Sequence, residues 1–349
     1  MVQNYLSNKA ASIKPYTAGM QPKDKNIIKL NTNENPYPPS PKTLEAYKDF
    51  DLAALRLYPR PDGGVLKSTI AKIYNLPENY VFCGNGSDEV LAFAFNAFFD
   101  SDIMFPDVTY SFYPVWASLF SITYKTLPVN NDFTIPVKKL YAKGVVLANP
   151  NAPTGIALEP RDIEYVLSSN KNSVVIVDEA YAAFGAQSVA PLVPKFPNLL
   201  VINTLSKSHA LAGMRIGYAI GQPHLISGLN RIKDSFNSYP VDMVAQTVGS
   251  AALSDTLYYA DIAKKIIATR EDTATALTRL GFNVLPSCAN FLFVTKKGQS
   301  AIRLKDYLER SHIYVRYFRA PRISEYLRIS IGTNDQMAAL LQKIRDFNG

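Results

Sequence analysis

The chain has 349 residues, enough for about two domains with buried cores. Hydrophobic residues make up 47% and charged residues 19%, a balance that excludes a disordered or collagenous chain. Lysine and arginine total 37 against 29 acidic residues, and the resulting net charge of +8 is spread along the chain. Such a charge suits anionic small ligands as well as it suits nucleic acid.

The predicted elements alternate between helices and strands through the first two thirds of the chain. The first forty residues, rich in asparagine and proline, predict an extended arm with turns. Helical patterns follow at 65–76 and 89–99, and buried strands at 145–150, 173–181 and 199–207 end in polar loops. This alternation predicts a mostly parallel α/β sheet, whose ligands bind at the carboxyl ends of the strands.

The pattern changes from about residue 243. A long helical stretch at 255–280 precedes short strands at 291–294 and 327–331, which predicts a smaller α+β domain. We therefore divide the chain into an N-terminal arm (1–28), a large α/β domain (29–242) and a small C-terminal domain (243–349). Because the sequence has no flexible linker between them, we expect the two domains to pack firmly around a cleft that holds the ligand.

The cysteines and the N-terminus bear on metal binding and on the cellular compartment. Cys83 and Cys288 lie far apart, without a CxxC pattern, and only three histidines accompany them. We therefore expect neither disulfides nor a metal site, and a reducing cytoplasm is the simplest location. Because no apolar run approaches about 18 residues and the N-terminus lacks an apolar core, we expect neither a membrane span nor a signal peptide.

Lys207 is a candidate catalytic residue because it follows the apolar strand pattern at 199–203, at the expected ligand edge. Its amine can form a Schiff base with an aldehyde cofactor if burial, or a positive charge such as Arg215, lowers its pKa. The alternative is a surface lysine on a loop, which describes most Ser-Lys pairs.

Asp178 is a candidate partner for the same cofactor, since it ends the apolar run 174–177. In a pyridoxal phosphate enzyme an aspartate pairs with the protonated ring nitrogen, and Tyr181 could reach the ring hydroxyl. The same run also fits the Walker B strand of a nucleoside triphosphatase, but the chain contains no GxxxxGK[ST] sequence.

The sequence GNGSDE at 84–89 is a turn of small residues that enters an apolar helix. Free N–H groups at such a helix start bind phosphate, whereas the alternative is an ordinary helix capped by Ser87 or Asp88. Tyr110 could supply a stacking face, although ordinary packing is the alternative in a chain with 21 tyrosines. If they share one pocket, these groups supply an amine for an aldehyde, a partner for a pyridinium, a cradle for a phosphate and an aromatic face. This combination favours pyridoxal 5'-phosphate as the cofactor.

With these motifs the chain resembles the fold type I pyridoxal-phosphate-dependent aminotransferases of class I and II, and among them the histidinol-phosphate aminotransferases. The resemblance runs nearly end to end and rests on KLNTNENPYPPSP, LYPRPDG, GNGSDE, NPNAPTG, VVIVDEAYAAF, TLSKSHALAGMRIGY, ANFLFV and LRISIGT. It implies a large α/β domain with a mostly parallel central sheet, a smaller α+β domain and an N-terminal arm. It also implies transamination of L-histidinol phosphate with 2-oxoglutarate to imidazole-acetol phosphate and glutamate, a step of histidine biosynthesis.

The resemblance implies a role for individual residues. Lys207 would form the Schiff base, Asp178 would pair with the pyridinium and Tyr181 would bond the ring hydroxyl. The other cofactor contacts that it implies are Gly86, Ser87, Asp88, Tyr110, Asn151, Thr204, Ser206 and Arg215, with Tyr58 reaching across from a second subunit of a homodimer. The substrate contacts that it implies are Tyr16, Asn33, Arg316 and Arg328.

The anion-binding residues leave alternatives open. Two guanidinium groups suit the phosphate dianion of histidinol phosphate, but Arg319 and Arg322 crowd the segment of Arg316, and any of these could be a surface charge. An aromatic amino acid aminotransferase would need only Arg328 for its substrate carboxylate, and a threonine-phosphate decarboxylase-like enzyme is a further alternative. A basic binding protein with an inactive aminotransferase body is the alternative of another class, although no helix-turn-helix or basic cluster occurs.

Ala152 departs from the family pattern, in which asparagine precedes Pro-Thr-Gly and bonds the ring hydroxyl. Alanine cannot donate a hydrogen bond. The ring oxygen would therefore rely on Tyr181, unless Asn151 or a water substitutes.

Overall fold

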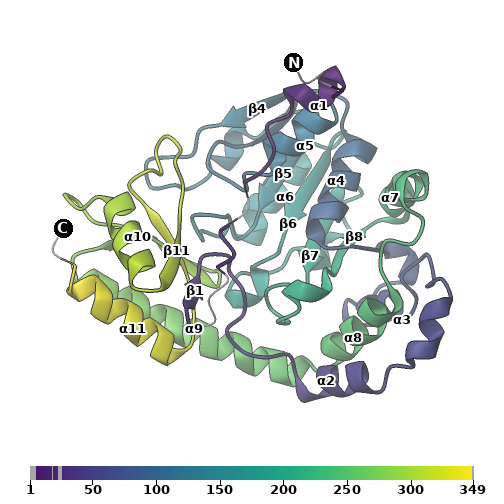
Figure 1. Cartoon of the computed structure of the whole chain (residues 1–349). Coiled ribbons are helices and arrows are strands. Elements are labelled where there is room, and N and C mark those ends of the chain that lie inside the picture. Colours follow the sequence, from purple (N-terminus) through teal and green to yellow (C-terminus); the bar gives the residue numbers. More distant parts are fainter. Residues whose placement is uncertain (1–4, 18, 23–25, 348–349) are drawn as a thin grey trace.

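The computed structural model describes residues 5–17, 19–22 and 26–347, and its larger sheet has seven strands in the order β2-β8-β7-β6-β5-β3-β4 (Figure 1). These strands are β2 (Val81–Gly84), β3 (Ile103–Pro106), β4 (Tyr124–Leu127), β5 (Gly144–Ala148), β6 (Val174–Asp178), β7 (Leu199–Thr204) and β8 (Gly217–Gly221). Neighbouring strands pair in parallel except at β8, which is antiparallel to both β2 and β7. The predicted mostly parallel sheet is confirmed.

Each face of this sheet has its own hydrophobic core, because successive side chains of a strand point to opposite faces. On one face, Val145 and Leu147 of β5 pack with α3 (Gly64–Ile73), α6 (Pro160–Ser169) and α8 (Met243–Ser254). On the other face, Val146 packs with α4 (Ser87–Phe98), α5 (Tyr113–Leu119) and α7 (Pro223–Phe236). Burial of both faces explains the continuous apolar runs of the central strands.

The second sheet has five strands in the order β1-β11-β12-β10-β9. They are β1 (Ile28–Leu30), β9 (Asn283–Val284), β10 (Phe291–Thr295), β11 (Ile313–Tyr317) and β12 (Leu327–Ser330). The helices α9 (Thr256–Arg279), α10 (Ala301–Arg310) and α11 (Asn334–Arg345) share its core, and α9 runs along the lower edge of the molecule towards α2 (Pro41–Lys48) (Figure 1). The long helix and both strands expected in this region are present.

Two elements lie across the expected domain boundaries. Strand β1 pairs in parallel with β11, so the first residues assigned to the large domain belong to the smaller sheet. Helix α8 shares the core of the larger sheet, although it begins where the small domain was expected to start. The division at residues 28 and 242 stays a prediction, and these two elements are its exceptions.

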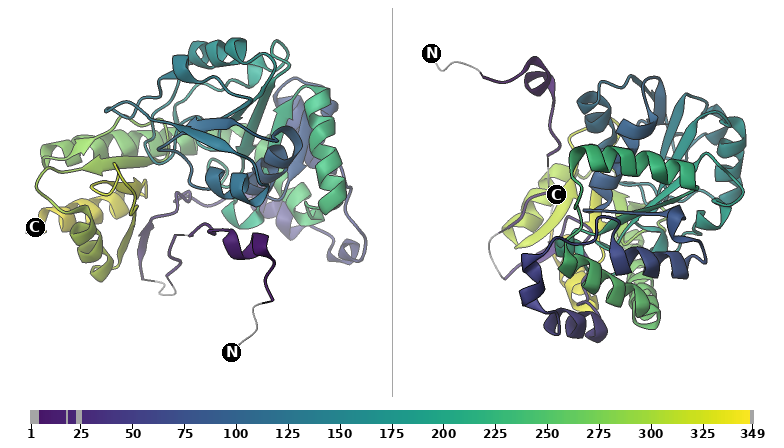
Figure 2. Two further views of the ribbon diagram at one scale, coloured as in Figure 1. Left: turned by 90° about the horizontal axis from the view of Figure 1, so that it is seen from above. Right: turned by 90° about the vertical axis from the view of Figure 1, so that its right-hand side faces the viewer.

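The N-terminal arm is less extended than expected. Residues Asn8–Ser12 form the short helix α1, whose first turn is capped by the Ser7 hydroxyl. None of its residues is buried, and α1 stands off the body of the molecule (Figure 2). The described residues between α1 and β1 instead approach the cavity described below.

Candidate active site

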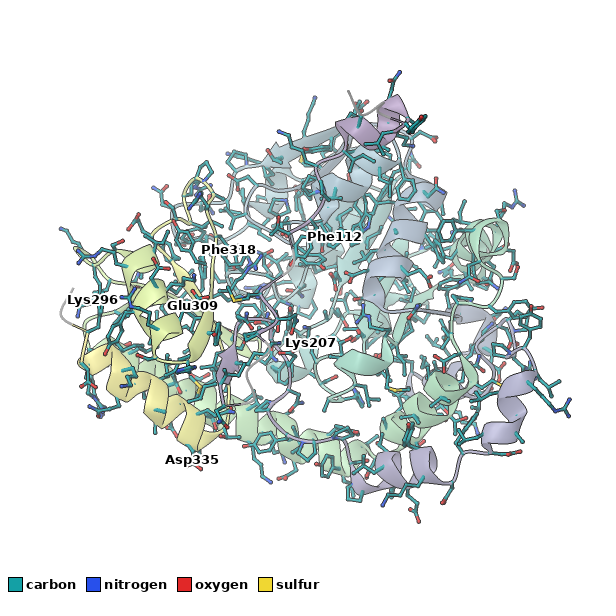
Figure 3. The ribbon with its side chains drawn as sticks, in the orientation of Figure 1. Phe112, Lys207, Lys296, Glu309, Phe318 and Asp335 are labelled. Atoms are coloured by element: carbon teal, nitrogen blue, oxygen red, sulfur yellow. The ribbon has the colours of Figure 1, made fainter. Side chains whose placement is uncertain are left out.

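A cavity of about 530 Å³ lies at the carboxyl ends of the central strands. The last residues of β5, β6 and β7, which are Ala148, Asp178 and Thr204, all line it, as expected for a parallel sheet. In Figure 3, Lys207 and Phe112 lie near the centre of the molecule, with Phe318 on the small-sheet side. Residues of the arm and of β11 and β12 complete the wall, so both sheets contribute to it.

Lys207 follows β7 and projects its amine into this cavity. Its Nζ donates to the Thr32 carbonyl at 3.0 Å, and the Asn35 amide donates to the Lys207 carbonyl at 2.9 Å. Burial, together with the nearby Arg328 guanidinium, lowers the pKa of Lys207 to about 8. A substantial fraction of neutral amine therefore exists near neutral pH, which a nucleophile or base requires.

Asp178 ends β6 with a buried carboxylate. One oxygen accepts from the Ala180 N–H at 3.1 Å, and the other accepts from the Tyr113 hydroxyl at 3.2 Å. Burial raises the pKa of Asp178 to about 6 despite these two donors. Because both donors are neutral, the carboxylate can still pair with a cation in the cavity.

Tyr113 was not predicted as a site residue. It is fully buried among Phe95, Phe105 and Trp116, and its hydroxyl reaches Asp178 through that aromatic cluster. The only signal in the sequence is its place one helical turn after Tyr110.

The turn before α4 forms an anion cradle. Gly86 has φ +87°, and a Cβ there would lie 2.5 Å from Nη2 of Arg215. Arg215 itself donates to Ser206 Oγ at 3.4 Å, while the Ser206 N–H donates to Thr204 Oγ1 at 3.1 Å. The N-terminus of α4, which begins at Ser87, and the guanidinium thus face one corner of the cavity, and both attract anions.

The Asp88 carboxylate positions two other side chains of this cradle, Tyr110 and Arg215. Its oxygens accept from the Tyr110 hydroxyl at 2.8 Å and from Arg215 Nη2 at 3.5 Å. The side chain thereby holds the stacking candidate and the guanidinium in place. Its backbone N–H, in the first turn of α4, remains the group suited to an anion.

Two arginines lie at the opposite side of the cavity. Arg316 of β11 and Arg328 of β12 are directly paired in the sheet, and both guanidiniums lie 5.4 Å from the Phe318 ring centre. Arg328 donates to the Asn31 carbonyl at 3.0 Å, but its buried Nε has no partner. Arg316 donates to the Thr17 carbonyl at 3.0 Å. This pair can bind an anion that carries more than one charge.

Arg319 and Arg322 do not line the cavity. Arg322 donates to Asp107 Oδ2 and to the Val129 carbonyl, each at 2.9 Å, and thus ties the loop before β12 to the large sheet. Of the three arginines that the sequence left open, Arg316 is the one that pairs with Arg328 and lines the cavity, and its contact with substrate stays a prediction.

Tyr16 brings the arm to the cavity. Its ring stacks on Phe112 at 4.6 Å between centres, and Phe112 stacks on Trp116 at the same distance. Phe112 was not predicted, and neither were the cavity residues Asn31, Thr32 and Glu34. The last three follow β1 in a polar segment, and only the pairing of β1 with the small sheet brings them to the site.

Three predicted residues do not line the cavity: Gly86, Asn151 and Tyr58. Gly86 lies against Arg215, as described above. The Asn151 side chain is buried. Its NH₂ group donates to the Val108 carbonyl at 2.9 Å and to Thr154 Oγ1, and its amide oxygen accepts from the Thr109 hydroxyl. Tyr58 is 81% exposed and stacks on Tyr239. The neighbouring Ala152, by contrast, does line the cavity.

Within the described ranges, no group of three or more histidine, cysteine, aspartate or glutamate side chains could hold a metal ion. None of the helices that the structure describes is both long and apolar enough to cross a bilayer.

The comparison with known families decides the relationship. The family model described as aminotransferase class I and II matches residues 25–344. The chain belongs to this aminotransferase family. The aminotransferase is 48% identical to a histidinol-phosphate aminotransferase of Clostridium botulinum (strain 657 / Type Ba4), with 99% of both chains covered. It is 50% identical to one of Marinomonas sp. (strain MWYL1), again over 99% of both chains.

Solved structures agree with the fold of this aminotransferase. The histidinol-phosphate aminotransferase from Sinorhizobium meliloti, in complex with pyridoxal-5'-phosphate, has a TM-score of 0.83 at 23% identity and covers 91% of each chain. The L-threonine-O-3-phosphate decarboxylase from Porphyromonas gingivalis has a TM-score of 0.78, also at 23% identity, over 92% of this chain and 99% of that chain. The predicted family and the predicted fold type are confirmed.

Proposed function

We propose that this aminotransferase transfers the amino group of L-histidinol phosphate to 2-oxoglutarate, with pyridoxal 5'-phosphate as its cofactor. The products are imidazole-acetol phosphate and glutamate, and the reaction is a step of histidine biosynthesis. The observation that carries the proposal is the 48–50% identity to histidinol-phosphate aminotransferases over 99% of the chain.

The groups in the cavity suit pyridoxal phosphate. Asp178 is a buried carboxylate with two neutral donors, which a pyridinium nitrogen would complete. The space between Gly86 and Arg215 leaves no room for a side chain at residue 86, and the adjoining N-terminus of α4 suits a phosphate. When bound, the cofactor supplies an electron sink for the negative charge that develops on the substrate carbon.

Lys207 is the proposed catalytic residue. Its amine, with a pKa of about 8, is the group that would hold the cofactor aldehyde as a nucleophile. With substrate bound, Nζ would be the base that takes the proton from the substrate carbon and holds it for return. Tyr110 offers the stacking face, and Asp178 keeps the ring nitrogen protonated.

Arg316 and Arg328 are the proposed ligands of the substrate phosphate. Their two guanidinium groups are neighbours on the small sheet, and the unpartnered Nε of Arg328 leaves a donor available. Tyr16 closes the same side of the cavity from the arm. A dianion is matched better by two such groups than by one.

We also propose a cytoplasmic homodimer in which Tyr58 contacts the cofactor phosphate of the partner. Tyr58 is exposed, and so are several large apolar side chains near it in the chain, namely Leu44, Tyr47, Leu52, Leu55 and Leu57. An exposed group of this kind supports burial in an interface. The free thiols of Cys83 and Cys288 are consistent with a reducing compartment.

The proposal is tested by the first half-reaction alone. The protein is saturated with pyridoxal phosphate, and its visible band is followed after addition of histidinol phosphate, phenylalanine or threonine phosphate without an amino acceptor. We expect rapid bleaching by histidinol phosphate only. Dominant bleaching by phenylalanine would make the protein an aromatic aminotransferase, and carbon dioxide release from threonine phosphate would make it a decarboxylase.

Lys207→Ala provides the matched test of the catalytic residue. We expect this variant to bind the cofactor but to lose turnover by at least 10³-fold, as is usual when a catalytic group that acts as nucleophile and base is removed. Borohydride treatment followed by peptide mapping should then find no covalent adduct. An adduct on another lysine would overturn the assignment.

A further inference from the structure

Asn33 lies where the arm, the small sheet and the cavity meet. It is 1% exposed, and its backbone is in the left-handed region with φ +56°. Its N–H donates to Ser330 Oγ at 2.8 Å, and its carbonyl accepts from the Asn290 amide at 3.0 Å. Its backbone groups are therefore fixed on both sides.

The side chain of Asn33 is held in one orientation by Ser330. The Ser330 hydroxyl accepts the Asn33 N–H, so its own proton is free to donate, and it donates to Asn33 Oδ1 at 2.8 Å. This contact turns the Asn33 NH₂ group away from Ser330 and towards Tyr181. Asn33 Nδ2 then donates to the Tyr181 hydroxyl oxygen at 3.0 Å.

The direction of that hydrogen bond determines where the Tyr181 proton points. Burial raises the pKa of Tyr181, so its hydroxyl keeps the proton at neutral pH. Asn33 is a donor to this oxygen and cannot also accept the proton. Among the described residues Asn33 is the hydroxyl's one hydrogen-bond partner, which leaves the proton for a group inside the cavity.

We propose that Asn33 is a positioning residue that aims the Tyr181 proton at the ring oxygen of the cofactor, and that Ser330 sets its orientation. This inference rests on the proposed function, and it replaces the expected role of Asn33 as a substrate contact. It also explains how the site accommodates Ala152, which cannot donate to the ring oxygen.

The same geometry joins the cofactor site to the proposed anion site. Ser330 and Arg328 are two residues apart on β12, so their side chains leave the same face of the strand. A shift of β12 on binding an anion at Arg328 would therefore move the anchor of Asn33 as well. The anchor of Asn33 and the anion ligand are thus parts of one strand.

The test is a spectroscopic titration of the cofactor-loaded protein without substrate. A donor to the ring oxygen lowers the proton affinity of the adjacent nitrogen, so losing it raises the pH midpoint of the visible band. Asn33→Asp replaces the donating NH₂ by an accepting oxygen, and aspartate tolerates the left-handed backbone. We expect this variant to raise the midpoint by about one pH unit, the scale of one hydrogen bond to a charged group.

Tyr181→Phe supplies the control, since it removes the aimed proton. In the Tyr181→Phe background, Asn33→Asp should retain at most about a third of its shift, which then reports only the added negative charge. Equal shifts in the two backgrounds would overturn the proposal. Three charged groups act on the Tyr181 hydroxyl, namely Arg328, Asp178 and Asp88, and all three are unchanged in every variant.

Ser330→Ala is the second variant, and it leaves Asn33 itself in place. We expect a smaller rise of the midpoint, because the freed amide can turn its oxygen to Tyr181. A normal visible band whose midpoint does not move in Asn33→Asp or in Ser330→Ala would overturn this inference alone. Absence of the band from the unmodified protein would overturn the proposed function, and the inference with it.

Discussion

Asp178 illustrates how a single residue can favour function over stability. Its carboxylate is buried, and the two groups that hydrogen-bond to it are neutral, so burial raises its pKa from 3.8 to about 6. Between these values the folded protein binds more protons than the unfolded chain. The stability of the cofactor-free protein therefore falls as the pH rises from about 4 to about 6, and stays lower above that range.

Asp178→Asn should remove this penalty. The asparagine can still accept from Ala180 N–H, and its NH₂ can donate to the Tyr113 hydroxyl. We expect the cofactor-free variant to be more stable than the unmodified protein at pH 7.5, by up to about 3 kcal/mol, and equally stable near pH 4. Urea unfolding at the two pH values checks this, and a difference independent of pH would contradict it.

Individual residues also show what the sequence could and could not predict. Asp178 and Lys207 were predictable because one apolar strand pattern ends at Asp178 and another ends shortly before Lys207. Tyr113 was not, since its link to Asp178 depends on how α5 packs on the sheet. Asn151 was placed in the site by motif alone, yet its amide donates to the Val108 carbonyl after β3 and to Thr154 of its own loop.

At the scale of elements, β11 and the loop that follows it hold two arginines with different contacts. Arg316 faces the cavity beside Arg328, whereas Arg322 joins the small sheet to Asp107 and the Val129 carbonyl beyond β3 and β4. Spacing in the sequence could not separate them, because both lie in one short basic segment. The distinction arises from the turn between the strands.

We expect Arg316→Gln and Arg322→Gln to separate binding from stability. Arg316→Gln should raise the KM for histidinol phosphate at least 10-fold with little change in stability, because it removes a charged ligand of the anion. Arg322→Gln should lower the free energy of unfolding by about 1–2 kcal/mol and change the KM by less than about twofold. Steady-state kinetics and urea unfolding of the two variants check both, and the reverse pattern would exchange the roles.

The pairing of an element near a domain boundary could not be predicted from the sequence either. The strands of the large sheet were visible as apolar runs, but β1 has only three residues, and its pairing with β11 joins opposite ends of the chain. Local patterns carry no signal for such a contact. The polar residues after β1, among them Thr32 and Asn33, were for this reason not assembled with Lys207 from pattern alone.

At the scale of the whole molecule, the proposed dimer distributes each site over two chains. Tyr58 does not line the cavity of its own chain and is 81% exposed. Exposed leucines precede it in the segment that contains the turn Leu52–Arg56. In the proposed dimer this tyrosine serves the site of the neighbouring subunit, which makes the proposal open to a complementation test.

Mixing two defective homodimers should restore activity. In a mixed dimer of Lys207→Ala and Tyr58→Ala subunits, one site combines an intact Lys207 with an intact Tyr58, and the other has neither. If subunits exchange freely, half of the dimers are mixed, and we expect about a quarter of the unmodified activity. Assays before and after joint refolding check this, and no gain over the separate variants would contradict the shared site.

The pairing of β1 with β11 has a consequence for how the protein is made. On the ribosome, residues 28–30 emerge well before residues 313–317, with which they pair. Until then the segment that bonds Lys207 and Tyr181 has no strand to lie against. A nascent chain can thus form its central sheet before this pairing, but the wall of the pocket that follows β1 is completed only after β11 has emerged.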